Sequence, residues 1–78
     1  MSRTFIDDNF LEWEAYVSGG QPGSKEAARI FFYCLDAPMN PARYVEHESR
    51  NVARAEAALL NMSDEELRTL LNGATLNA

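Results

Sequence analysis

The chain has 78 residues and a net charge of −5, with 46% hydrophobic and 24% charged residues. This length allows one domain with a thin core, and the composition is typical of a globular protein rather than of a disordered one. The acidic balance and the scattered basic residues disfavour attraction to nucleic acid or to anionic membranes, and the single cysteine excludes an internal disulfide.

The first element expected along the chain is a half-buried strand over residues 10–17, preceded by a loose lead-in over residues 1–9. The short polar side chains of Asp7, Asp8 and Asn9 favour a turn within that lead-in, because they hydrogen-bond to their own backbone. Polar and apolar residues then alternate, which is typical of a strand with one dry face. The residues expected on the dry face are Leu11, Trp13, Ala15 and Val17.

A glycine-rich segment, residues 18–24, follows and favours a hairpin connection, since glycine adopts positive φ at little cost. Residues 27–35 then contain an apolar run that fits either a strand or the buried stripe of a helix with Ser24 as its N-cap. Consecutive isoleucine, phenylalanine and tyrosine residues and the preceding turn favour the strand.

Two prolines make residues 36–41 a loop, and residues 42–47 are expected to form a short third strand. The charged side chains of this segment suit an exposed edge of a sheet. The sequence therefore predicts a small antiparallel three-stranded sheet, made of a β-hairpin plus the short third strand.

Two short helices are expected after residue 49. Apolar residues of the first recur every three or four positions, with Ser49 or Asn51 as its N-cap and Asn61 ending it in the left-handed conformation. The second begins with a capping box, in which Ser63 and Glu66 each satisfy the other's amide, and ends near Gly73. The helix residues expected to face the sheet are Val52, Leu59, Met62, Leu67, Leu70 and Leu71.

The predicted fold is α+β: one domain over residues 1–78, with both C-terminal helices packed on one sheet face and residues 1–9 and 75–78 loose. The sheet residues expected to meet the helices are Leu11, Trp13, Val17, Ile30 and Phe32. No apolar segment has the length of a signal peptide core or a membrane span, which favours a cytoplasmic protein.

The second sheet face is the most informative feature, because the run of residues 29–35 is apolar on both of its sides. An apolar patch bordered by charges is typical of an interaction surface. We expect a homodimer or another protein partner there, and neither nucleic acid nor membrane. The simpler alternative is that Phe5, Ile6 and the proline loop fold back over this face. The interface residues predicted are Phe10, Tyr16, Arg29, Phe31, Tyr33 and Leu35.

No motif predicts a catalytic residue, a cofactor or a metal site. Residues 19–25 lack the order of a phosphate-binding loop, because Glu26 stands where the magnesium-binding hydroxyl belongs. A small enzyme or ligand-binding protein that uses Cys34, His47 or the aromatic face as a pocket is the alternative to an interaction module. RNA binding through stacked aromatic residues is disfavoured, since acidic residues are expected on the same face.

Overall fold

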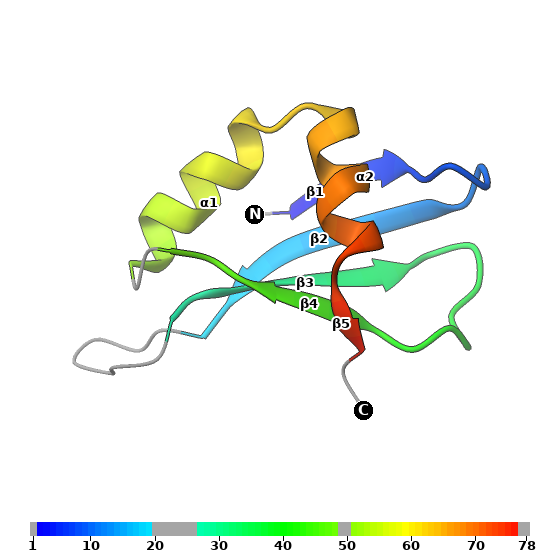
Figure 1. Ribbon diagram of the computed structural model, residues 1–78, viewed down its shortest axis with the longest axis horizontal. Coiled ribbons are helices and arrows are strands. Elements are labelled where there is room, and N and C mark those ends of the chain that lie inside the picture. The colour runs from blue at the N-terminus through cyan, green and yellow to red at the C-terminus, as the bar shows by residue number, and fades with distance from the viewer. Residues whose placement is uncertain (1, 20–26, 49–50, 77–78) are drawn as a thin grey trace.

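A computed structural model describes residues 2–19, 27–48 and 51–76 as a five-stranded antiparallel sheet with two helices packed on one of its faces (Figure 1). The elements are β1 (Ser2–Ile6), β2 (Glu12–Ser18), β3 (Arg29–Cys34), β4 (Arg43–Glu46), α1 (Val52–Asn61), α2 (Asp64–Asn72) and β5 (Thr75–Leu76). The strands lie side by side in chain order, and both helices are inserted between β4 and β5. The predicted α+β class is confirmed, but the sheet has five strands where three were predicted.

The two additional strands are the outer strands of the sheet. β1 pairs with β2, and β5 pairs with β4 through two residue pairs, so parts of both chain ends that we expected to be loose are hydrogen-bonded. The prediction that the third strand lies at the edge is wrong, because β5 covers the outer side of β4. Residues 77–78 lie outside the described part of the chain.

The turn between β1 and β2 is organised by one carboxylate. Asp7 Oδ1 accepts hydrogen bonds from the backbone N–H groups of Asn9 (2.8 Å) and Leu11 (2.9 Å), and Oδ2 accepts one from Trp13 Nε1 (2.7 Å). Burial opposes ionisation of this group, but these three bonds and the charge of Arg43 outweigh it and lower the pKa of Asp7. The predicted turn is confirmed, and β2 begins only at Glu12 because the turn includes residue 10.

The apolar run of residues 29–35 is a strand, as predicted. Buried and exposed residues alternate along β3, and its partners on the two sides are β2 and β4. The helical alternative is therefore wrong. Residues 20–26, which include most of the glycine-rich connection and the proposed helix cap at Ser24, lie outside the described residues.

Both helices have the side-chain caps that their sequences favour. Asn51 accepts a hydrogen bond from the Arg54 amide at the start of α1, while the alternative cap, Ser49, lies outside the described residues. The capping box of Ser63 and Glu66 is present at the start of α2. The expected left-handed end of α1 is wrong: the helix ends at Asn61, and the residue after it is extended.

The core lies between the helices and one sheet face, and the predicted composition of that face is confirmed. Phe32, Ile30, Leu59 and Leu67 are its largest fully buried side chains. Phe5 of β1 also packs there, edge-on against the Phe32 ring at 6.0 Å between ring centres. The remaining buried residues of this cluster are Trp13, Ala15, Cys34 and Leu71.

Arg3 fastens β1 to the junction of the two helices. Its Nη1 donates hydrogen bonds to the carbonyls of Leu59 (3.4 Å), Leu60 (3.1 Å) and Met62 (2.8 Å), which terminate α1. Its Nη2 pairs with Asp64 Oδ1 at 3.0 Å, at the first residue of α2. One guanidinium thus satisfies the carbonyl end of one helix and complements the start of the next.

Candidate interaction surface

The sheet face opposite the helices, called here the open face, is covered by no secondary-structure element among the described residues (Figure 1). The strand register places the second set of alternating residues on it. Its central row runs across the sheet through Ser2, Tyr16, Phe31, Tyr44 and Thr75.

Four rings on three strands form what we call the aromatic cluster: Tyr16, Phe31, Tyr33 and Tyr44. The Tyr16 ring stacks on Phe31 and on Tyr33, with 5.7 Å and 5.6 Å between ring centres. Phe31 contacts Tyr44 on its other side at 6.0 Å. Direct and diagonal cross-strand pairs of this kind each stabilise a sheet modestly, so the cluster is internally packed before any partner binds.

Charged residues border the cluster. The Arg29 guanidinium lies 4.7 Å from the centre of the Tyr44 ring and 3.6 Å from the Glu46 carboxylate. Glu14, in the next row, accepts a hydrogen bond from the Ser2 hydroxyl at 3.0 Å. The open face is therefore an apolar centre with a polar rim, which is the usual composition of a protein interface.

The phenols of Tyr16 and Tyr33 are linked, with 3.3 Å between their oxygens. This hydrogen bond, followed by burial and by the nearby charge of Glu14, raises the pKa of Tyr16 to about 12. The Tyr16 phenol is consequently neutral at physiological pH. It adds hydrogen-bonding capacity to the cluster without adding charge.

The described part of the N-terminal arm, from residue 2 onward, does not cover this surface. Phe5 packs on the opposite face, in the core, and Met39 of the proline loop is 97% exposed. Ile6 lies at the margin of the open face and stays partly exposed. The alternative, in which these segments fold back over the open face, is therefore wrong for Phe5 and for the tip of the loop.

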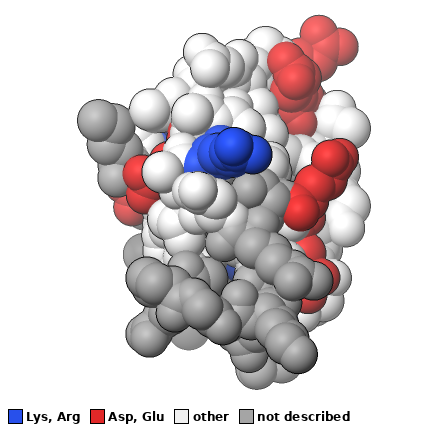
Figure 2. All heavy atoms as spheres, turned by 90° about the vertical axis from the view of Figure 1, so that its left-hand side faces the viewer, with Lys and Arg blue, Asp and Glu red and all other residues white. Residues whose placement is uncertain are grey.

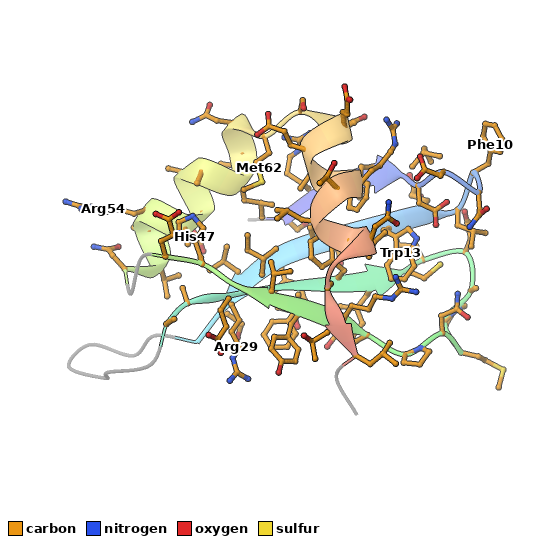
Figure 3. All side chains as sticks on the ribbon, viewed as in Figure 1. Phe10, Trp13, Arg29, His47, Arg54 and Met62 are labelled. Atoms are coloured by element: carbon orange, nitrogen blue, oxygen red, sulfur yellow. The ribbon has the colours of Figure 1, made fainter. Side chains whose placement is uncertain are left out.

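The structure brings together four of the six residues predicted for the interface: Tyr16, Arg29, Phe31 and Tyr33. Leu35 follows β3 directly and is exposed, with its N–H bonded to the Glu12 carbonyl. Phe10 is displaced from the strand into the β1–β2 turn, and it points away from the body of the molecule (Figure 3).

Sequence reasoning did not place Tyr44 in the cluster. Residues 42–47 were expected to form a strand, but which residue of it faces Phe31 depends on the β3–β4 register. That register is determined by the geometry of the loop between the strands, for which the sequence offers no clear turn motif.

The thiol–imidazole pair of the alternative enzyme hypothesis is not assembled. The His47 amide bonds to the Ala28 carbonyl, just before β3, whereas Cys34 is the last residue of that strand. Six residues of extended chain separate the two ends by about 20 Å. Cys34 is buried in the core, which fits its interpretation as a small apolar residue.

An open groove of about 270 Å³ in the helix layer is lined by Met62, Glu66, Thr69 and Leu70, and it includes neither Cys34 nor His47. Within the described ranges, no three His, Cys, Asp or Glu side chains group as metal ligands would. None of the helices in this part of the chain is long and apolar enough to cross a bilayer.

At the end of the molecule from which Arg54 projects, acidic side chains lie on both sides of a group of basic atoms (Figures 2 and 3).

Comparisons of this chain with protein-family models, with curated proteins and with solved structures found no match. Any statement about function therefore depends on the geometry and chemistry of the surfaces described above.

Proposed function

We propose that this protein is a non-enzymatic interaction module that associates with a protein, either a second copy of itself or another chain, through the aromatic cluster of its open face. The observation that supports the proposal is four partly exposed rings in contact on one sheet face, without a covering layer among the described residues. Aromatic side chains dominate binding energy at interfaces because they bury large areas with few rotamers to fix.

The charged rim favours a protein over a nucleic acid as the partner. Glu14 and Glu46 lie beside the cluster and would repel phosphates, whereas Arg29 already contacts a carboxylate and a ring. We further propose a cytoplasmic location, consistent with a single buried thiol and no disulfide.

The test compares two exposed apolar side chains on opposite sides of the molecule. Tyr33 in the cluster and Leu60 on α1 are both 40% exposed, so Tyr33→Glu and Leu60→Glu introduce the same charge at matched exposure. Solution mass is measured by sedimentation over a concentration series. If the chain self-associates, we expect twice the monomer mass of 8.8 kDa and dissociation by Tyr33→Glu only.

A wild-type chain that stays monomeric refutes self-association and leaves another protein as the partner. Affinity capture with the wild-type chain and both variants then decides: a protein retained by wild type and Leu60→Glu but not by Tyr33→Glu supports the proposal. If Tyr33→Glu changes neither the mass nor the captured proteins, the cluster is not an interface and the proposal fails.

A further inference from the structure

The β1–β2 turn holds a phenylalanine in a conformation that suits glycine. The Phe10 amide donates to the Asp7 carbonyl (3.1 Å) and the Asp7 amide to the Leu11 carbonyl (2.9 Å), which encloses a three-residue hairpin loop. In such loops the third residue is left-handed and is commonly glycine. Phe10 occupies that position with φ of 65°.

The Phe10 side chain does not offset the strain of this conformation by packing on the fold. A bulky side chain at positive φ brings its Cβ close to the following carbonyl, which destabilises the fold relative to glycine. Phe10 is nevertheless 86% exposed, so its ring gains almost no packing energy. A strained residue that contributes nothing to the fold points to a role outside it.

Hydrogen bonds also fasten the turn to the rest of the fold, which pre-organises the backbone that carries the ring. The Asp7 carboxylate joins the turn amides to Trp13, whose indole is in the core. Asp36 Oδ2 accepts a hydrogen bond from the Glu12 amide at 2.7 Å and so fastens the start of β2 to the β3–β4 loop. An exposed aromatic side chain on a pre-organised loop loses little entropy on binding.

The surroundings of Phe10 define the chemistry of its partner. The β3–β4 loop lies at the same end of the sheet (Figure 1) and carries the exposed side chains of Leu35 and Met39. The carboxylates of Asp8 and Asp36 are exposed in the same two loops. These negative charges disfavour an anionic bilayer and complement a protein surface with basic residues around an apolar pocket.

We propose that Phe10 is the anchor of a second interface, where its ring enters an apolar pocket bordered by Lys or Arg on a partner protein. This interface is separate from the aromatic cluster, because Phe10 lies in a turn at one end of the sheet and the cluster lies at the centre of the open face. The two proposals therefore succeed or fail independently.

The test starts from a chain in which residue 10 is p-benzoylphenylalanine, a photoreactive analogue of phenylalanine, expressed in the cells from which the protein originates. The cross-linked protein is identified, purified and titrated with three full-length chains: wild type, Phe10→Tyr and Phe10→Gly. We expect Phe10→Tyr to bind like wild type and Phe10→Gly to bind about tenfold more weakly or worse. Raising the salt concentration is expected to weaken binding, since the rim is charged.

Thermal unfolding of the same variants gives the decisive contrast. Because glycine relieves the left-handed strain, Phe10→Gly is expected to unfold at a higher temperature than wild type while it binds more weakly. A lower unfolding temperature would mean that the ring packs on its own fold, and it overturns the proposal. Three other results also overturn the proposal. Phe10→Gly binds the partner as tightly as wild type, no protein is cross-linked, or the chain binds neutral phosphatidylcholine vesicles, insensitively to salt, in place of a protein.

Discussion

Arg3 is the residue whose removal best tests how the strands and helices are joined. In Arg3→Ala, the carbonyls of Leu59, Leu60 and Met62 lose their common donor, and Asp64 loses its ion pair. The Arg3 side chain is 24% exposed, so water replaces the donor only in part. We expect a loss of stability, with β1 and the helix junction the first parts to loosen.

The magnitude follows from the geometry. The 2.8 Å bond to Met62 is charge-assisted and partly buried, and such bonds contribute about 1.5–3 kcal/mol. The two longer bonds share the same nitrogen, and the ion pair with the 53%-exposed Asp64 adds about 0–1 kcal/mol. The expected loss is about 2 kcal/mol, which lowers the unfolding temperature of so small a domain by about 8–16 °C.

Urea denaturation followed by Trp13 fluorescence measures this loss, and Asp64→Asn is the control. Since Asp64 is half exposed, removing its charge is expected to cost about 0.5 kcal/mol or less. If Asp64→Asn costs as much as Arg3→Ala, the ion pair rather than the carbonyl capping fastens β1. If Arg3→Ala costs under about 0.5 kcal/mol, water substitutes for the guanidinium and the reasoning is refuted.

Three further predictions concern the core and two titrating groups. Leu67→Ala, at a fully buried position, is expected to cost about 2–5 kcal/mol in urea denaturation, because the core has no second layer to collapse into the cavity. The pKa of Asp7 is lowered in the folded protein. Its ionised carboxylate therefore stabilises the fold above pH 3.8, the ordinary pKa, and this stabilisation is lost as the pH falls through the lowered pKa. Asp7→Asn is therefore expected to be less stable than wild type at neutral pH, with the difference shrinking in acid, as followed by Trp13 fluorescence. Tyr33→Phe removes the hydrogen bond that raises the pKa of Tyr16 to about 12, so phenolate absorbance of Tyr16 is expected to appear at lower pH.

Each of these has a result that contradicts it. A Leu67→Ala chain as stable as wild type would mean that this part of the core repacks. If Asp7→Asn loses stability in acid in the same way as wild type, other carboxylates govern acid unfolding. An unchanged Tyr16 titration in Tyr33→Phe would assign the raised pKa to burial instead.

Local signals in the sequence were sufficient to predict the middle strands and the helices. Alternation identifies the dry face around Trp13 and Phe32, and the Ser63–Glu66 capping box marks the start of α2 without any tertiary information. These predictions succeeded because the interactions lie within one element or between neighbouring strands.

The outer strand β5 could not be predicted, because its partner strand β4 lies far earlier in the chain. In β1, Arg3 lies on the inner side of the strand, and a charged residue there argues against a strand with a buried face. The carbonyls that accept hydrogen bonds from Arg3 are almost 60 residues later in the chain. Phe10 extends the alternating pattern of β2 by one residue, yet it lies in the turn, because its amide donates to the Asp7 carbonyl and the Asp7 carboxylate binds the Asn9 and Leu11 amides. For the candidate interface, the same limits explain why Phe10 was misplaced and Tyr44 was missed.

The order of the elements along the chain has a consequence for biosynthesis. Every helix residue that covers the dry sheet face follows β1–β4 in the sequence, and Arg3 finds its partners only when α1 is complete. At about 5–20 residues per second, a ribosome exposes the strands for seconds before it delivers the layer that buries Trp13, Ile30 and Phe32. Until α1 and α2 have been made, these apolar side chains lack the layer that covers them in the fold and are open to contact with other chains.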